Sequence, residues 1–254
     1  MTRPLAGKIV LVTRAADRSD RLVRLLERRG ARPVLAPSIE LVPARSAALT
    51  GALGLLVAAE FEWIVLTSQA TVEMLADRIG SPRDVRANVA VIGDGTAEAW
   101  RRWSRRSPEL QPRTFTTAAL ARAFPRGSGR VLCARADIAP EGLEAALAGK
   151  GWKPMRVDAY RTRFPRSLPS GARDALRTGE VDAVTFTSAS TVRGFVGALG
   201  PVKGNPKVVC LGPVTSREAR ARGMTVAAVA KPHTMEGLVA ALERVFTPRR
   251  AAHR

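Results

Sequence analysis

The chain has 254 residues, and hydrophobic residues make up 46% of them, which suits a globular protein of one or two domains. Its formal charge of +19 indicates either an anionic partner or a basic surface with no special role. No apolar run is as long as a membrane span, and no signal-peptide pattern opens the chain, so we expect a cytoplasmic protein. The two cysteines lie in apolar runs without metal-ligand spacing, so we expect buried thiols and no metal site.

The apolar periodicity predicts strands that alternate with helices along the whole chain. We expect strands at 8–12, 32–36, 63–66, 89–92, 131–134, 153–157, 182–186, 208–211 and 226–229. We expect helices at 17–29, 46–59, 69–78, 96–105, 117–124, 140–150, 169–178, 191–199, 214–222 and 234–245. This alternation is typical of an α/β protein with doubly wound parallel sheets, and the basic tail from Thr247 is expected to be disordered.

Three blocks of sequence recur in the same order. Residues 8–34 match 130–155 at an offset of 121, 62–75 match a later block at 120, and 88–100 match another at 119. Three matches in register indicate an internal duplication, and each copy is about the size of a small domain. The extended stretches 37–43 and 158–164 follow the second strand of each copy, so they are expected to pair as a two-stranded bridge.

Hydroxyl side chains follow the strands of both copies. Ser188 follows one predicted strand, and Thr215 and Ser216 are expected to open the helix after the next. Serine and threonine cap helices, and the free N–H groups of a helix N-terminus favour anions. Because such turns lie at the carboxyl edge of a parallel sheet, where ligands bind, the pattern predicts an anion-binding edge. Capping alone would also explain each hydroxyl.

A dinucleotide fingerprint is absent from the chain. The first strand leads into VTRAADRSD rather than into a glycine-rich turn. The glycine cluster at 92–99, IGDGTAEA, follows a strand and precedes a helix, but it lacks the third glycine. The sequence therefore gives little support to a nucleotide cofactor, and we expect none.

Five motifs together resemble the uroporphyrinogen-III synthase family, in order along nearly the whole chain. They are LVTR at 11–14, YRT at 160–162, VTFTSASTV at 184–192, CLGPVTSREARARG at 210–223 and AKPHTMEGLVAAL at 230–242. The resemblance implies two α/β domains joined by a two-stranded linker, with the active site in a cleft between them. The implied boundaries are 1–36 plus 164–254 for one domain, 43–157 for the other, and 37–42 with 158–163 for the linker.

The resemblance also implies the reaction. The family converts hydroxymethylbilane into the macrocycle uroporphyrinogen III, with inversion of the last ring and loss of water, in haem biosynthesis. That activity is a hydro-lyase reaction that needs no metal or cofactor. The substrate carries an acetate and a propionate on every ring, so the basic composition and the predicted anion-binding edge suit it.

Tyr160 is the only tyrosine of the chain, and by resemblance it corresponds to the tyrosine proposed in the family as acid or hydrogen-bond donor. At neutral pH a phenol with an ordinary pKa is protonated and can donate to a departing hydroxyl group. A linker residue that merely docks its ring is the alternative. The resemblance further suggests substrate-binding roles, each weighed against a structural one, for a set of polar residues: Thr215, Ser188, Thr96, Ser68 and Arg14.

Two further residues are weaker candidates for a role in the site. Arg135 is the duplicate of Arg14, and His233 is expected at the cap of the last helix beside Thr234. The helix at 117–124 lacks the E-G-L that often begins it in relatives, which leaves its substrate contacts open.

Two other classes of protein compete with the synthase hypothesis. A catalytically inactive, synthase-like regulatory module would use the positive charge for nucleic acid, but aromatic residues make up only 5% of the chain, few for stacking on bases. A periplasmic-type two-domain ligand binder kept in the cytoplasm shares the bilobal α/β plan, but the missing signal peptide and the motifs speak against it. We therefore expect a monomeric enzyme with a tetrapyrrole substrate and with neither nucleic acid nor membrane as partner.

Overall fold

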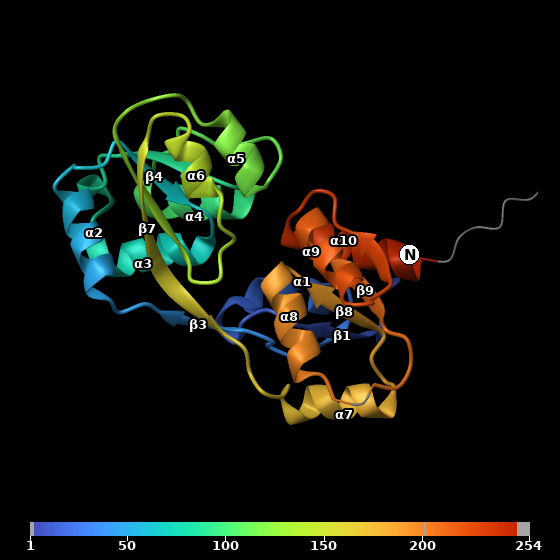
Figure 1. Ribbon diagram of the computed structural model, residues 1–254. Coiled ribbons are helices and arrows are strands. Elements are labelled where there is room, and N and C mark those ends of the chain that lie inside the picture. Colours follow the sequence, from blue (N-terminus) through green and yellow to red (C-terminus); the bar gives the residue numbers. More distant parts are fainter. Residues whose placement is uncertain (1–2, 201, 248–254) are drawn as a thin grey trace, which may run out of the picture. The chain divides into compact units, whose positions relative to one another are not determined.

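The computed structural model describes residues 3–200 and 202–247. The chain divides into two compact units, Met1–Glu40 with Arg163–Arg254, and Leu41–Thr162 (Figure 1). The boundaries expected from the sequence lay at 36, 43, 157 and 164, a few residues from this division. None of the helices in the described part of the chain combines the length and the apolarity needed to cross a membrane.

The first unit is built on a five-stranded sheet in the order β10-β9-β8-β1-β2, and every pair in it is parallel. Its strands are β1 (Ile9–Val12), β2 (Arg32–Leu35), β8 (Ala183–Phe186), β9 (Lys207–Cys210) and β10 (Val226–Val229). Its helices are α1 (Asp20–Arg28), α7 (Ser170–Thr178), α8 (Ala189–Ala198), α9 (Pro213–Ala221) and α10 (Met235–Phe246).

Successive strand residues of this sheet face two different cores. Val10, Val12 and Val209 pack with residues of α1 and α10, whereas Leu11 and Val184 pack with residues of α7, α8 and α9. Side chains alternate between the faces of a strand, so both faces of the sheet are covered by helices. This is the doubly wound α/β arrangement that the alternating pattern predicted.

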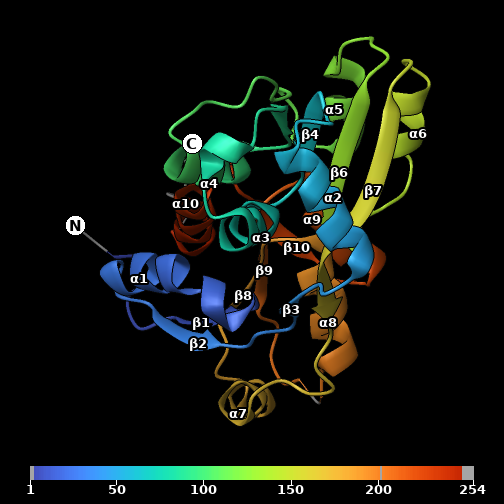
Figure 2. The ribbon, with the colours of Figure 1, turned by 90° about the vertical axis from the view of Figure 1, so that its left-hand side faces the viewer.

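The second unit contains a sheet in the order β3-β7-β6-β4-β5. Its strands are β3 (Glu40–Pro43), β4 (Trp63–Leu66), β5 (Asn88–Val91), β6 (Arg130–Ala136) and β7 (Lys153–Arg163), and Figure 2 shows β6 and β7 side by side. Its helices are α2 (Ala47–Val57), α3 (Gln69–Ile79), α4 (Asp94–Ser104), α5 (Thr117–Ala123) and α6 (Leu143–Ala148).

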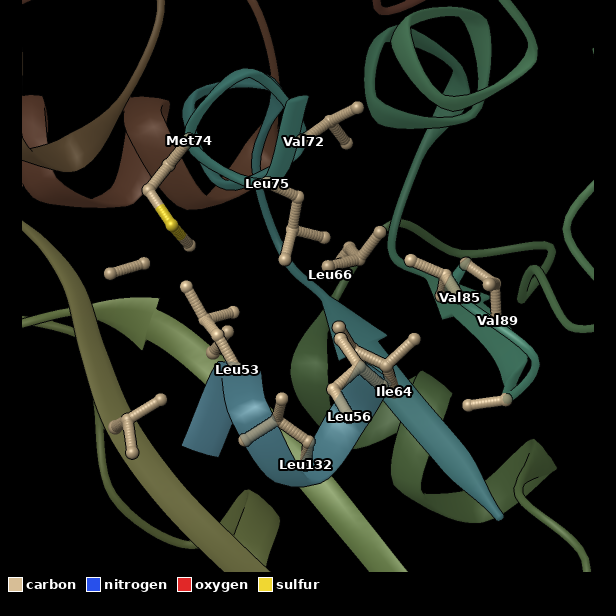
Figure 3. Packing of buried hydrophobic residues seen from close by; sticks show 14 of the residues in the cluster. Leu53, Leu56, Ile64, Leu66, Val72, Met74, Leu75, Val85, Val89 and Leu132 are labelled. Carbon is tan, nitrogen blue, oxygen red and sulfur yellow. The ribbon is translucent and has the colours of Figure 1, made fainter. Parts of the chain in front are cut away.

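Here too, the helices cover both faces of the sheet. Leu53 and Leu56 of α2 and Leu75 of α3 pack with Ile64 and Leu66 of β4 on one face (Figure 3). The residues of α5 and α6 belong to the cluster on the opposite face, which also contains the alternate residues of β4 and β6. The carboxyl ends of the parallel strands β4, β5 and β6 therefore remain as the edge at which functional side chains can gather.

The internal duplication appears directly in the two sheets. The order β9-β8-β1-β2 in the first unit corresponds, strand for strand, to β5-β4-β6-β7 in the second. The matching blocks 8–34 and 130–155 contribute β1 and β2 in one sheet and β6 and β7 in the other. Each sheet then adds one strand of its own, β10 or β3, at opposite ends of this shared order.

The helix predictions at 140–150 and 17–29 need correction, and one 3-10 turn was missed. The expected helix at 140–150 is shorter, because Gly142 has a left-handed φ of 104° and the helix begins only after it. The expected helix at 17–29 is divided into a 3-10 turn, Ala16–Arg18, and α1. A second 3-10 turn, Pro82–Asp84, was missed, because the proline at its start is equally typical of a loop.

The stretch 158–163 does not form a separate segment. It continues the preceding strand without a break, as the second half of β7. β3 is the neighbour of β7 in the sheet, and next to it the backbone N–H of Ala44 donates to the carbonyl of Ala159 at 3.2 Å. The tail predicted to be disordered lies outside the described residues from 248 onward.

Candidate functional site

Serine caps mark the helices that follow β4 and β8. The Oγ atoms of Ser68 and Ser188 accept the backbone N–H groups of Thr71 and Thr191, each at 3.2 Å. Both serines have extended backbones, as N-cap residues do, so the capping interpretation is correct for this pair. Ser188 adds a hydrogen bond to the hydroxyl of Ser190 at 2.8 Å.

Thr96 and Thr215 are placed differently from the expectation. The two helices begin earlier, with Gly93 and Gly212 at the N-cap, so neither threonine opens its helix. Both threonines lie in the first turn with their side chains buried, 7% exposed for Thr96 and 4% for Thr215. A glycine N-cap has no side-chain signal, and the start signal that Pro213 gives at the first position of α9 was overlooked.

Tyr160 and Ser68 form the clearest polar contact of the predicted set. The Tyr160 hydroxyl donates to Ser68 Oγ at 3.1 Å, although the two residues are 92 positions apart. The Ser68 hydroxyl is also within 3.0 Å of the Thr71 hydroxyl, so the phenol joins a chain of hydroxyl groups at the N-terminus of α3. The structure therefore places the phenol at the carboxyl edge of the second sheet.

The N-termini of α3 and α4 are joined by a side chain that sequence reasoning missed. Gln69 Nε2 donates to the carbonyl of Gly95 at 3.1 Å. Asp94, at the first position of α4, accepts a hydrogen bond from Gln111 Nε2 at 2.7 Å. A carboxylate at this position is favourable for the helix, because it lies at the positive end of the dipole. Its duplicate in α9 is Pro213, so the two copies differ in charge here.

The two duplicate arginines have different environments. Arg135 is only 1% exposed, and its Nη1 contacts both carboxylate oxygens of Glu144, at 2.9 and 3.0 Å. A guanidinium held in this way is a structural ion pair rather than a binding group for a ligand. Arg14 is half-buried, and its Nη1 lies 2.9 Å from the sulfur of Met235, the first residue of α10.

An aromatic ring lies near the glycine N-cap of α4, and another lies somewhat farther from that of α9. A Cβ added to Gly93 would lie 3.2 Å from the Phe115 ring, and one added to Gly212 would lie 3.9 Å from the His233 ring. The cap of α10 is Thr234, whose hydroxyl accepts the N–H of Gly237 at 3.1 Å. His233 therefore precedes the cap rather than forming it.

The family model for uroporphyrinogen-III synthase HemD matches residues 20–240. The chain belongs to the uroporphyrinogen-III synthase family. It is 29% identical to the uroporphyrinogen-III synthase of Synechococcus elongatus, over 95% of this chain and 97% of that one. It is 32% identical to a putative uroporphyrinogen-III synthase of Methanothermobacter thermautotrophicus, over 91% and 96%.

Solved structures agree on the fold. A mutant uroporphyrinogen-III synthase from Thermus thermophilus superposes with a TM-score of 0.63 at 21% identity, over 94% of this chain and 98% of that one. The uroporphyrinogen-III synthetase of Helicobacter pylori gives 0.60 at 14% identity, over 92% and 97%. The α/β fold with two predominantly parallel sheets is thus the fold of the uroporphyrinogen-III synthase family, whose members are lyases of tetrapyrrole biosynthesis.

Proposed function

We propose that this chain cyclises hydroxymethylbilane to uroporphyrinogen III, with inversion of the last ring and loss of water. The C–O bond of the hydroxymethyl group breaks first, and the leaving hydroxide takes up a proton to depart as water. The substituted carbon of the last ring then attacks the resulting azafulvene cation to give a spiro intermediate. Cleavage of one bond of that intermediate and closure at the other carbon invert the ring, and loss of a proton completes the product.

The observation that carries the catalytic step of this proposal is the hydrogen bond from the Tyr160 hydroxyl to Ser68 at the N-terminus of α3. In the free protein this bond orients the phenol. When substrate binds, its hydroxymethyl group takes over the phenolic proton as the C–O bond breaks, which is general acid assistance. Tyr160 is therefore proposed as the catalytic donor, and Ser68 as the group that holds it.

The proposed carboxylate-binding groups lie at the N-termini of helices that follow the strands of each sheet. Ser68 and Thr96 belong to α3 and α4 in the second unit, and Ser188 and Thr215 belong to α8 and α9 in the first. The free backbone N–H groups at these ends suit the acetate and propionate groups of the substrate. Arg14 is proposed as a cation that binds substrate beside α10.

The two α/β units are proposed to act as separate domains with the extended stretches as their linker. We further propose that the protein works as a monomer in the cytoplasm and without nucleic acid. The domain-sized duplication supports the two domains, and the low aromatic content speaks against stacking on nucleic-acid bases. The relatives reported above are named as synthases, which favours catalysis over a purely regulatory role.

The test is to incubate the purified protein with freshly generated hydroxymethylbilane and to separate the oxidised porphyrin isomers. We expect isomer III to replace isomer I, the product of unassisted closure, at catalytic protein concentrations. Heat-denatured protein serves as the blank. If only isomer I forms while the intact protein still binds the product, the chain is an anionic-ligand-binding module and the synthase proposal is wrong.

The role of Tyr160 is tested by Tyr160→Phe, which removes one hydroxyl group and little volume. The rate of isomer III formation should fall by roughly a hundredfold, a typical loss for a general acid. Thr215→Ala should reduce the rate less, because the backbone N–H groups of α9 remain. An unaltered rate in Tyr160→Phe would remove Tyr160 from catalysis without touching the synthase assignment.

A further inference from the structure

The strand that bears Tyr160 extends beyond its neighbour. β6 ends at Ala136, and its last registered partner in β7 is Tyr160, whereas β7 continues to Arg163. On the β6 side, the backbone groups after Tyr160 therefore have no strand to pair with. The N–H of Thr162 is such a group, and Thr162 is only 8% exposed, so it needs another acceptor.

The register of the two strands changes just before Tyr160. Arg135 lies opposite Asp158, but Ala136 lies opposite Tyr160, so β7 contains one extra residue, Ala159. An extra residue of this kind is a bulge, and a shift of one residue moves a side chain to the other face of the strand. The bulge therefore decides on which face of β7 the Tyr160 phenol lies, and with it the reach to Ser68.

Asp137 replaces the missing strand at this place. Its backbone N–H donates to the carbonyl of Tyr160 at 3.1 Å, and its Oδ1 accepts the N–H of Thr162 at 2.9 Å. The same oxygen accepts the N–H of Ile138 at 2.9 Å, which fixes the carboxylate itself. One residue thus holds the chain on both sides of Arg161, directly after the bulge.

The loop that contains Asp137 is itself anchored. Arg156 Nη2 donates to the carbonyls of Asp137 and Ala139, both at 3.2 Å. The hydrogen bonds from Arg156 keep the aspartate in place without occupying its carboxylate. Movement of Asp137 away from β7 would have to break these bonds as well.

The other copy of the duplication lacks this arrangement. At the offset of 121, the equivalent of Asp137 is Ala16 and the equivalent of Tyr160 is Ile39. The first sheet forms the same strand order without an aspartate there. The fold alone therefore does not require the carboxylate, and it occurs in the copy that carries the tyrosine.

We propose that Asp137 is a positioning residue for Tyr160. Its carboxylate and backbone N–H hold residues 160–162 so that the phenol remains hydrogen-bonded to Ser68. Without the carboxylate, the N–H groups of Thr162 and Ile138 lose their acceptor, and the strand end is free to shift. This inference rests on the proposed role of Tyr160 in catalysis, and it adds the residue through which the fold sets the position of that side chain.

The single tyrosine makes the proposal measurable. Protein labelled with ¹³C at the tyrosine ζ carbon gives one signal, which reports Tyr160 alone. Asp137→Ala should shift or broaden this signal and lower kcat about tenfold to a hundredfold, with KM little changed, because the donor is misplaced rather than removed. Asp137→Asn should keep most of the activity and the wild-type signal, because its amide oxygen can accept the same two N–H groups.

Asp182→Ala is the matched control for loss of stability. Asp182 Oδ2 accepts the N–H of Ile9 at 2.8 Å, and its Oδ1 accepts from Lys8 Nζ at 2.8 Å, so it is a similar clamp in the first unit. This variant should lower the melting temperature while leaving the Tyr160 signal unchanged. If Asp137→Ala does not fold, Asp137→Glu tests the same point, because it keeps the charge but displaces the carboxylate by one methylene.

A double variant separates positioning from a direct role. Asp137→Ala should have little further effect on kcat in the Tyr160→Phe background, because it acts through the hydroxyl that is already missing. An equal loss of kcat in both backgrounds, or an unchanged Tyr160 signal in Asp137→Ala, overturns the proposal. If wild-type protein makes no isomer III, the proposed function fails, and the carbon signal alone decides whether Asp137 positions Tyr160.

Discussion

At the scale of single residues, Ser68 and Ser188 form a matched pair that the duplication supplies. Both cap a helix through the same hydrogen bond at 3.2 Å, but only Ser68 also accepts the Tyr160 hydroxyl. The position equivalent to Tyr160 is Ile39, so Ser188 has no phenol of this kind to orient. The two serines therefore separate the cost of losing a cap from the cost of losing a partner for Tyr160.

Ser68→Ala and Ser188→Ala should each lower the free energy of unfolding by about 1 kcal/mol, the usual value of a helix cap. Ser68→Ala should also lower kcat several-fold more than Ser188→Ala does, because the phenol loses its acceptor. Thermal melts and initial rates of isomer III formation measure the two effects. Equal losses of kcat would mean that the hydrogen bond to Tyr160 has no separate role.

The two cysteines are inert for a residue-scale reason. Cys133 and Cys210 are fully buried in β6 and β9, and burial raises the pKa of both thiols from 9.0 to about 12. The folded state therefore favours the neutral thiols. Their contribution to stability is complete below pH 9 and is lost as the pH rises from about 9 towards 12. In this range the thiols of the unfolded chain ionise while those of the folded protein stay neutral, so ionisation favours unfolding.

At neutral pH, the native protein should accordingly react very slowly with a thiol reagent such as 5,5′-dithiobis(2-nitrobenzoate). Protein unfolded in guanidinium chloride should release the chromophore from both cysteines at once. Rapid reaction of either cysteine in the native protein would contradict its burial. Activity should survive the treatment of native protein, which serves as the control.

At the scale of elements, α8 packs closely against the segment that follows β2. Ser38 is completely buried, and its hydroxyl lies 3.0 Å from the carbonyl of Thr13 and 2.8 Å from that of Thr191. A Cβ added to Gly194 of α8 would overlap the carbonyl oxygen of Ser38, whereas one added to Gly197 of the same helix meets nothing within 4 Å. Glycine is thus required at only one of the two positions.

Gly194→Ala should destabilise the protein by about 1–3 kcal/mol, because the helix or the segment must shift to relieve the overlap. Gly197→Ala should be neutral or should stabilise the fold by up to about 1 kcal/mol, because alanine favours a helix over glycine. Urea unfolding of both variants measures the difference. A Gly194→Ala variant as stable as the wild type would show that α8 does not need this close approach.

At the scale of the whole molecule, the formal charge of +19 is the dominant electrostatic property. Some arginines are already paired with carboxylates, for example Arg29 with Glu243 at 2.6 Å and Arg21 with Glu236 at 2.9 Å. These pairs involve partly exposed side chains, so each contributes little to stability. The surplus of basic groups is expected to attract an anionic ligand over a distance instead.

Binding of the oxidised product, an anionic porphyrin, should therefore weaken as salt is raised from low to physiological ionic strength, since screening shortens the range of this attraction. Fluorescence titration at several salt concentrations measures the effect, and an uncharged porphyrin ester is the control that should show little salt dependence. Salt-independent binding of the acid would mean that short-range contacts alone hold the ligand. Tight, salt-dependent binding of random duplex DNA without porphyrin binding would instead favour a nucleic-acid-binding module.

The sequence alone determined the alternation of strands and helices, the duplication, and the serine caps at Ser68 and Ser188. These features depend on local properties, namely apolar periodicity and hydroxyl groups beside a helix start. Such properties involve residues that are close in the chain, so they can be recognised in the sequence. It also made Tyr160 a candidate catalytic residue, because this is the only tyrosine and it matches the family. It placed the starts of the helices that contain Thr96 and Thr215 too late, because the glycine caps before them have no side chain to mark the start.

Only the tertiary structure decided what the Tyr160 hydroxyl contacts. The bulge at Ala159 has no mark in the sequence, yet it sets the face on which the phenol lies and brings it to a serine 92 positions away. The role proposed for Asp137 depends on where β6 ends, and Arg135 is an unsuitable ligand-binding group because it is buried in an ion pair with Glu144 of α6. Strand ends, registers and ion pairs arise between segments that are distant in the chain, so their consequences appear only when those segments pack together.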